Sequence, residues 1–293
     1  MATVPPDDGF HERYYSSQDG LRLYFRDYGD ALAPGVTAVC LAGFARNSRD
    51  FHRLARRLGA GRRLLCPDYR GRGRSAYDRQ WRNYEPRTYL DDIRHLLALT
   101  NTHRAVFIGT SLGGFLAAGM SVAAPGAVAG VILNDVGPEI DQRGLERILA
   151  YLSADRPQPD WDGAVRFLKE AFPGLAFASE SAWLELARNT YRLGADGRLH
   201  FDWDVNITRS FAAGRARDLW PLFRALGTMP TVALRGERSD ILSAATLERM
   251  AHVKPDLACV TVSGVGHAPT LDEPEARAAI DSFLASLDER ERH

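Results

Sequence analysis

Apolar and polar residues alternate near the start of the chain, and farther on the apolar residues form short continuous runs. Residues 12–28 alternate around Tyr14 and Phe25, with Asp19-Gly20 between the two halves, which predicts a β-hairpin. Six later apolar runs are typical of strands that are covered on both faces of a sheet. They lie at residues 36–41, 64–66, 106–108, 128–136, 231–234 and 257–262.

Between these runs, apolar residues recur at the three- and four-residue spacing of an amphipathic helix. The predicted helices begin near Asn47, cover 88–99, begin again just past residue 111, and span 244–253 and 274–287. Thr88 and Asp91 have the spacing of a capping box. Strands that alternate with helices indicate an α/β fold with a mostly parallel, doubly wound sheet of the eight-stranded type and an N-terminal β-hairpin.

The pattern changes after the sixth predicted strand. Helical segments near 143–153, 162–172, 180–193 and 212–226 are separated by Pro and Gly, and no convincing buried strand lies among them. We therefore predict an insertion over residues 137–227. The core of the fold then consists of residues 1–136 and 228–293.

Composition narrows the class of protein. The 293 residues, 45% of them hydrophobic, are enough for one large domain with an insertion. Zero formal net charge gives no reason to expect nucleic acid or an anionic membrane as a partner. The sequence gives no indication of the oligomeric state. The start of the chain lacks a basic and apolar leader, and no apolar run is long enough to span a membrane, so we expect a cytoplasmic protein. Cys40, Cys66 and Cys259 lie in or beside predicted strands, and we expect reduced core residues.

Residues 105–118 carry the most specific chemical signal. A strand-like run ends at Gly109, and a helix-forming run begins just past Ser111, so the serine lies at an abrupt turn from strand to helix. The sequence Gly109-Thr-Ser-Leu-Gly113 matches the Gly-x-Ser-x-Gly nucleophile elbow. Glycine is needed at both ends because neighbouring backbone must pass close by. Ser111 is the predicted nucleophile.

Two further candidates follow the last two predicted strands. Asp240 follows the strand that ends at Leu234, and His267 follows the strand that ends at Val262. Ligands bind in open α/β sheets outside the carboxyl ends of the strands, so Ser111, Asp240 and His267 are expected to meet there. Asp135 ends the strand before the insertion and is the alternative acid, although its surroundings equally fit a hinge turn.

These motifs together resemble the α/β-hydrolases that carry a cap domain. The resemblance rests on the elbow, on Asp240, on Gly-Val-Gly-His-Ala-Pro around His267, and on Asp-Tyr-Arg-Gly-Arg-Gly-Arg-Ser from Asp68. It implies a catalytic triad in which Ser111 is the nucleophile, His267 the base and Asp240 the orienting acid. It also implies that the insertion is a cap and that the loop after Asp68 is structural.

An oxyanion hole requires donors that are already in place when the carbonyl is attacked. The candidates are the backbone N–H groups of Phe44, after the first buried strand, and of Leu112, directly after the nucleophile. The family commonly has His-Gly before the first of these, whereas this chain has Ala42-Gly43, so the side chain that usually braces the loop is missing. Arg46 and Asn47 lie close behind and are candidate substrate contacts, although a solvated helix start also explains them.

The predicted cap is rich in aromatic residues, which favours an apolar pocket over the serine. They are Trp161, Phe167, Phe172, Phe177, Trp183, Tyr191, Trp203, Phe211 and Trp220. Most are expected to form the small core of the cap itself. We therefore expect a serine hydrolase that cleaves a small, mostly apolar carboxylic ester or lactone through an acyl-enzyme, with no metal or cofactor. A carbon–carbon bond hydrolase of a vinylogous diketone and a non-catalytic small-molecule receptor are the alternatives.

Overall fold

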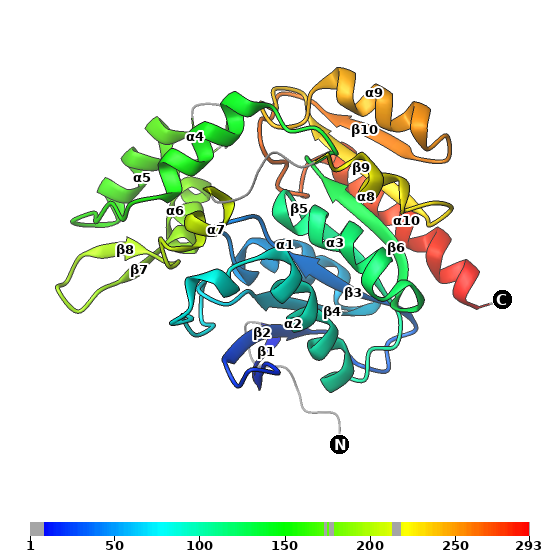
Figure 1. Ribbon diagram of the computed structural model, residues 1–293, viewed down its shortest axis with the longest axis horizontal. Coiled ribbons are helices and arrows are strands. Elements are labelled where there is room, and N and C mark those ends of the chain that lie inside the picture. Colours follow the sequence, from blue (N-terminus) through cyan, green and yellow to red (C-terminus); the bar gives the residue numbers. More distant parts are fainter. Residues whose placement is uncertain (1–8, 173–174, 176–178, 213–217, 293) are drawn as a thin grey trace.

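Eight strands form one sheet at the centre of the computed structural model, which describes residues 9–172, 175, 179–212 and 218–292 (Figure 1). Their order across the sheet is β1-β2-β4-β3-β5-β6-β9-β10. The bounds are β1 (Phe10–Ser16), β2 (Arg22–Tyr28), β3 (Gly35–Leu41), β4 (Arg62–Asp68), β5 (Ala105–Thr110), β6 (Val128–Asn134), β9 (Thr231–Gly236) and β10 (Ala258–Val262).

The sheet is mostly parallel, as the sequence predicts. β1 runs antiparallel to β2, with Phe10 opposite Tyr28, and β2 runs antiparallel to β4. Every other pair of neighbours in this sheet is parallel. All residues of β6 are buried, which explains why this strand is continuously apolar up to Asn134 instead of alternating. The predicted α/β class, eight strands and N-terminal hairpin are confirmed.

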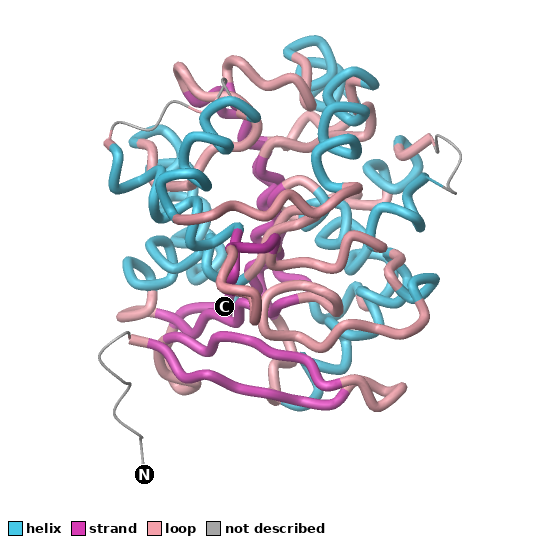
Figure 2. Tube along the Cα trace, turned by 90° about the vertical axis from the view of Figure 1, so that its left-hand side faces the viewer, coloured by secondary structure: helices cyan, strands magenta, loops and turns pink. Residues whose placement is uncertain are grey.

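Helices cover both faces of the sheet, which is seen close to edge-on in Figure 2. On one face, α2 packs on α3, α3 packs on α8, and Arg249 of α9 lies over the ring of Trp220 of α8. α1 pairs with α10 through Arg57 and Asp281. The bounds are α1 (His52–Leu58), α2 (Pro86–Leu99), α3 (Leu112–Ala123), α8 (Trp220–Arg224), α9 (Ala244–Val253) and α10 (Pro274–Glu291).

Helix starts differ from the sequence prediction in one instructive place. α2 begins at Pro86, and Thr88 lies inside its first turn, so the predicted capping box of Thr88 is wrong. Proline sets the start because its fixed φ suits the first turn and it has no N–H that would need an acceptor there. Asn47, by contrast, does cap a helix: its side chain accepts the N–H of Arg49 at the start of η1 (Ser48–Phe51).

The segment between β6 and β9 contains the predicted cap, and its elements from α4 to α7 lie to one side of the sheet, whereas α8 lies over the sheet (Figure 1). It also contains a short hairpin, β7 (Tyr191–Leu193) with β8 (Leu199–Phe201), which the helical prediction missed. Three-residue strands are too short to leave a periodic signal. Within the helix predicted at 212–226, only α8 forms in the described part, because α7 ends at residue 212 and residues 213–217 lie outside that part. The helices before α8 are α4 (Gln142–Leu152), α5 (Trp161–Ala171), α6 (Glu180–Thr190) and α7 (Ile207–Ala212).

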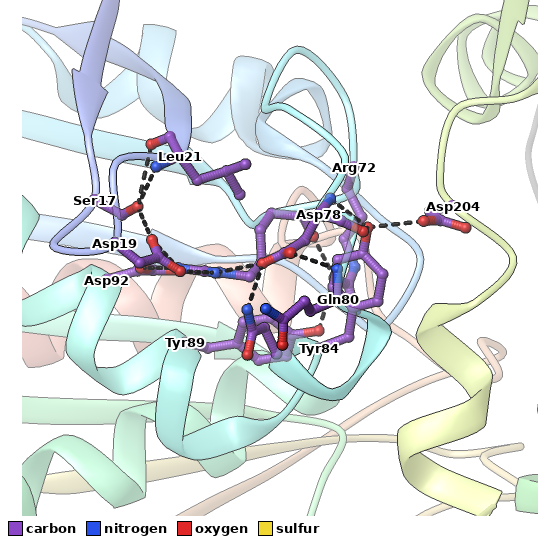
Figure 3. A network of polar contacts seen from close by, with 12 residues as sticks. Ser17, Asp19, Leu21, Arg72, Asp78, Gln80, Tyr84, Tyr89, Asp92 and Asp204 are labelled. Carbon is purple, nitrogen blue, oxygen red and sulfur yellow. Dashed lines mark hydrogen bonds and ion pairs between the residues drawn. The ribbon is translucent and has the colours of Figure 1, made fainter.

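The loop that follows Asp68 is built around a buried arginine, Arg70, whose carboxylate partners Asp19, Asp78 and Asp92 are labelled in Figure 3. Arg70, whose side chain is 1% exposed, donates to Asp92 at 2.7 and 2.8 Å and to both Asp19 and Asp78 at 2.8 Å. The arginine thereby ties the turn of the N-terminal hairpin to α2. The Asp68 carboxylate, also buried, accepts two backbone N–H groups. These contacts explain the arginine- and glycine-rich sequence as a structural loop.

Two of the three cysteines are core residues, as expected. Cys40 and Cys66 are fully buried in β3 and β4. Cys259 is exposed in β10, at the edge of the sheet, so the expectation of a core residue is wrong there. No helix within the described part of the chain is both long and apolar enough to cross a bilayer.

Candidate active site

Ser111 lies at the turn between β5 and α3, in a backbone conformation that few residues other than glycine adopt. Its φ is 53° and its ψ is −116°. A Cβ on Gly113 would lie 2.0 Å from the carbonyl oxygen of Leu41, and one on Gly109 would lie 2.2 Å from the oxygen of Gly113. Both positions therefore require glycine. The turn is the tight strand-to-helix elbow that the sequence predicts.

His267 is held by Asp135. The imidazole Nδ1 lies 2.8 Å from Asp135 Oδ2, and the carboxylate is fully buried. The other carboxylate oxygen accepts the backbone N–H of Gly236 at 2.9 Å, and Oδ2 also accepts the hydroxyl of Ser239 at 2.6 Å. A carboxylate on Nδ1 fixes the imidazole in the tautomer that leaves Nε2 as the proton acceptor.

The prediction that Asp240 holds the imidazole is wrong. Its carboxylate accepts the Nε and Nη2 groups of Arg147 at 2.9 and 2.6 Å, and its side chain is 46% exposed. Asp135 comes directly after β6, whereas Asp240 is four residues beyond the end of β9, where Arg147 binds its carboxylate. From the same loop it is Ser239 that reaches the Asp135 carboxylate.

Asn134 connects the loops that carry these side chains. Its backbone oxygen accepts the N–H of Ser111 at 3.0 Å. Its side-chain amide donates to Thr110 Oγ1 at 3.0 Å and to the backbone oxygen of Pro269 at 2.9 Å. The residue is fully buried, so these contacts are protected from water. The elbow and the histidine loop are therefore fixed relative to each other by one side chain that the sequence reading did not single out.

The loop at Phe44 has braces that replace the missing histidine. The hydroxyl of Tyr69 donates to the Ala42 oxygen at 3.1 Å, and Arg72 Nε donates to the Phe44 oxygen. The Gly43 oxygen accepts the N–H of Arg46 at 3.1 Å. Because C=O and N–H point in opposite directions in a trans peptide, this contact fixes the direction of the Phe44 N–H.

Leu112 is the first residue of α3, and its side chain is buried in the core. The first N–H groups of a helix have no acceptor within that helix and carry its positive dipole end. The N–H of Leu112, adjacent to Ser111, is thus of the kind that stabilises a negative oxygen. Phe44 lines the same cavity as Ser111 and His267.

The cavity over Ser111 has a volume of about 280 Å³ and is mostly apolar. Its apolar wall comes largely from the predicted cap: Ile148, Tyr151, Leu152, Leu168, Phe172 and Trp203. Most of the aromatic residues of the predicted cap do not line it, and Phe177 and the side chain of Phe211 lie outside the described residues. Tyr151 packs against Phe167, Phe172, Phe201 and Trp203. The aromatic residues therefore form a small core of which one side faces the cavity.

Charged side chains in the cavity wall occur as ion pairs. Arg46 pairs with Asp50, and Arg53 pairs with Glu185. Arg147 also lines the cavity and pairs with Asp240. Within the described ranges, no three His, Cys, Asp or Glu side chains are grouped as metal ligands.

The chain is similar to known hydrolases in sequence. A model of the alpha/beta hydrolase family matches residues 38–280. The 3-hydroxybutyrate-oligomer hydrolase of Cupriavidus necator is 31% identical over 274 residues, which cover 90% of this chain and 92% of that protein. The 2-(acetamidomethylene)succinate hydrolase of Mesorhizobium japonicum is 29% identical over 252 residues, which cover 85% and 88%.

Solved structures are also similar. An alpha/beta hydrolase from Novosphingobium aromaticivorans has a TM-score of 0.88 at 44% identity, covering 97% of this chain and 99% of that one. The structure of E-2-(acetamidomethylene)succinate hydrolase has a TM-score of 0.81 at 26% identity, covering 95% and 99%. Fold, elbow and sequence similarity agree along most of the length, and the chain belongs to the alpha/beta hydrolase family.

Proposed function

We propose that the chain is a serine hydrolase that cleaves a carboxylic ester through an acyl-enzyme. Ser111 is the nucleophile, His267 the general base and Asp135 the acid that orients the imidazole. The observation that carries this proposal is the 2.8 Å contact between Asp135 Oδ2 and His267 Nδ1, at the cavity that also contains the strained Ser111. A serine hydroxyl is a weak nucleophile until such a histidine takes its proton.

In the proposed reaction, Ser111 Oγ attacks the ester carbonyl carbon while His267 Nε2 takes the hydroxyl proton. The buried Asp135 carboxylate stabilises the imidazolium that forms. The N–H groups of Phe44 and Leu112 bind the oxyanion, and each such donor is typically worth about 3 kcal/mol in the transition state. The intermediate then expels the alcohol, which takes the proton from Nε2. Water attacks the acyl-enzyme by the same steps and releases the acid.

The cavity supports a small and mostly apolar ester or lactone as the substrate. About 280 Å³ is close to the lower end of the range of small-molecule sites, and the walls are mainly aliphatic and aromatic side chains. The relative from Cupriavidus necator is named for oligomers of 3-hydroxybutyrate, which are esters. We therefore propose short-chain esters, rather than long acyl chains, as the substrates of this chain.

Hydrolysis of p-nitrophenyl butyrate tests the proposal, with Ser111→Ala as the inactive variant. The expected loss of kcat/KM is at least about 10³-fold, because removal of a triad residue leaves only the oxyanion donors and binding. Ser153→Ala, a change at an exposed serine of the cap, is the matched control and should keep full activity. A fluorophosphonate probe should add its mass to the Ser111 peptide. Equal activity of Ser111→Ala and the parent protein would overturn the proposal.

A further inference from the structure

Among the ion pairs of the mostly apolar cavity wall, the pair of Arg46 and Asp50 belongs to a larger polar cluster. Arg46 Nε and Nη2 donate to the two oxygens of Asp50 at 2.7 and 2.5 Å, and Nη1 donates to Thr190 Oγ1 at 2.6 Å. Asp50 also accepts the side-chain amide of Asn189 at 3.3 Å. Arg46 and Asp50 are half-buried and line the cavity together with Ser111 and His267.

The cluster lies close to the proposed nucleophile. A Cβ built on Gly43 would lie 3.3 Å from Arg46 Cγ and 3.8 Å from Ser111 Cβ, so only the width of this glycine separates the two side chains. Arg46 is also two residues beyond Phe44, whose N–H is a proposed oxyanion donor. A substrate bound at Ser111 therefore extends past the Arg46 side chain if it turns to this side of the cavity.

The guanidinium of Arg46 retains donors for a ligand. It has five N–H groups, of which three are used by Asp50 and Thr190. The other two have no acceptor among the residues that the structure describes. The guanidinium is also held in place, because it forms a bidentate ion pair with Asp50 and its Nη1 donates to the hydroxyl of Thr190, which is fully buried. A donor held in this way loses little freedom when it binds a ligand.

Charge decides which ligand group fits. Asp50 neutralises Arg46, and a carboxylate bound beside the pair would face the negative oxygens of Asp50. The other two arginines of the cavity wall, Arg53 and Arg147, are also paired with carboxylates. An uncharged hydroxyl suits the site better, since it can accept a hydrogen bond from Arg46 and donate one to Asp50.

We propose that Arg46 and Asp50 form a subsite for a hydroxyl group of the substrate, so that the preferred ester is that of a hydroxy acid or of a diol. The inference rests on the proposed hydrolase reaction, in which Ser111 attacks an ester bound in this cavity. In this proposal, Arg46 and Asp50 make the site prefer hydroxylated esters over their purely apolar counterparts.

The test compares esters that differ only by a hydroxyl in place of a methyl group. The pairs are p-nitrophenyl 3-hydroxybutyrate with p-nitrophenyl 3-methylbutyrate, and 2-hydroxyethyl butyrate with propyl butyrate. The parent protein should prefer the hydroxylated member of one pair in kcat/KM, and Arg46→Gln should reduce that ratio about tenfold, as expected for lost hydrogen bonds to a charged group. A ratio that Arg46→Gln leaves unchanged for both pairs would overturn the proposal.

Arg53→Gln is the matched control, because Arg53 lines the same cavity in a more exposed ion pair. It should leave both ratios unchanged. Both esters of a pair are measured on one preparation of each protein. A smaller folded fraction of Arg46→Gln lowers kcat/KM for both esters equally and does not change their ratio. If Arg53→Gln lowers the ratio as much as Arg46→Gln does, the selection arises from the cavity as a whole, and the assignment to Arg46 and Asp50 is wrong.

Asp50→Asn tests the charge argument separately. This change leaves Arg46 uncompensated, so hydrolysis of the anionic mono-p-nitrophenyl succinate should rise about fivefold relative to p-nitrophenyl 3-methylbutyrate. A binding measurement separates failure of the subsite from failure of the proposed reaction. Calorimetry on Ser111→Ala, with ethyl 3-hydroxybutyrate and with 2-hydroxyethyl butyrate, should give for one of the two esters about tenfold tighter binding than on Ser111→Ala with Arg46→Gln. Equal affinities of the two proteins for both esters would overturn the subsite even if no ester were turned over.

Discussion

The hydroxyl of Ser239 donates to Asp135 Oδ2 at 2.6 Å, the same oxygen that lies 2.8 Å from Nδ1 of His267. Ser239 also accepts the backbone N–H groups of Ile241 and Leu242, both at 3.1 Å, so its hydroxyl proton is directed at the carboxylate. The sequence prediction placed the acid, Asp240, in the loop after β9. In the structure this loop instead supplies Ser239 as a hydrogen-bond donor to Asp135.

Replacement of Ser239 by alanine should slow the reaction without abolishing it. The change removes one of three hydrogen-bond donors to the Asp135 carboxylate, and the carboxylate then holds the imidazole less firmly. We expect kcat for p-nitrophenyl butyrate to fall about tenfold, which corresponds to the loss of one hydrogen bond of about 1.4 kcal/mol. KM should change little, because Ser239 does not line the cavity.

Ser239→Thr is the control, since threonine retains the hydroxyl. It should recover most of the lost kcat. If alanine and threonine lower kcat equally, the effect comes from packing of the loop, and the positioning role of Ser239 is wrong.

Asp135→Asn and Asp240→Asn distinguish the two candidate acids. Asparagine at position 135 cannot stabilise the imidazolium and favours the wrong tautomer, so kcat/KM should fall by about 10³ to 10⁴, as for such changes in other serine hydrolases. Asp240→Asn breaks an exposed pair with Arg147 and should change kcat/KM less than about twofold. Both are measured with p-nitrophenyl butyrate at one pH. Loss of activity in Asp240→Asn alone would restore the sequence-based assignment.

Much of the fold could be predicted from the pattern of apolar residues, because buried positions are mostly apolar. β6 is buried throughout and continuously apolar, and the α9 boundaries agree with the predicted range 244–253. The β7 and β8 hairpin was missed because its strands have three residues each, which is shorter than any periodic signal. Patterns of apolar residues report which surface is buried, so short elements such as these, between β6 and β9, leave little trace.

The site was predictable where local backbone geometry forces the residue type, and not where the choice depends on the path of a loop. Gly109 and Gly113 must be glycine because neighbouring backbone passes too close for a Cβ, so the sequence revealed the elbow around Ser111. Asp135 and Asp240 both follow strands, and the loop after β9 decides between them, because it places Ser239 against Asp135 and Asp240 against Arg147. Sequence alone does not give the path of that loop.

Tyr69→Phe tests the brace of the oxyanion loop. The change removes only the hydroxyl that donates to the Ala42 oxygen, and the ring keeps its stacking on Tyr89 at 5.3 Å. Free movement of the 42–44 peptides should weaken oxyanion binding, so kcat should fall about fivefold while KM stays similar. Tyr15→Phe, the same change in β1, is the control and should leave kcat unaltered. An equal fall in both variants would point to a general loss of stability.

Arg70→Met should strongly destabilise the fold. Arg70 is almost fully buried with Asp92 and Asp78, whose side chains are each 10% exposed, and methionine would leave these carboxylates uncompensated. Breaking a buried ion pair from one side typically costs about 3 to 5 kcal/mol of unfolding free energy. Urea denaturation measures it. Arg104→Met breaks the exposed pair with Glu291 and should cost less than about 1 kcal/mol. Similar losses in the two variants would contradict the structural role of the Arg70 network.

The stability of the β7–β8 hairpin should depend on pH through His200. Hydrogen bonds that the protonated imidazole of His200 donates to Asp155 at 2.6 Å and to Asp196 at 2.9 Å raise its pKa above the ordinary value. A histidine whose pKa is higher in the folded state stabilises that state fully below its unfolded pKa, near 6.5, and this contribution disappears as the pH rises through the folded pKa.

His200→Gln should therefore lower the melting temperature at pH 6 and have a smaller effect at pH 9. The difference is small because the pair is partly exposed, so melting curves of the two proteins are best compared in the same buffer at low salt. His103→Gln, a change at an exposed histidine far along the chain from this hairpin, controls for the general effect of losing an imidazole. A difference between parent and His200→Gln that grows with pH would show that His200 is neutral in the folded protein, and would contradict its pairing with the two carboxylates.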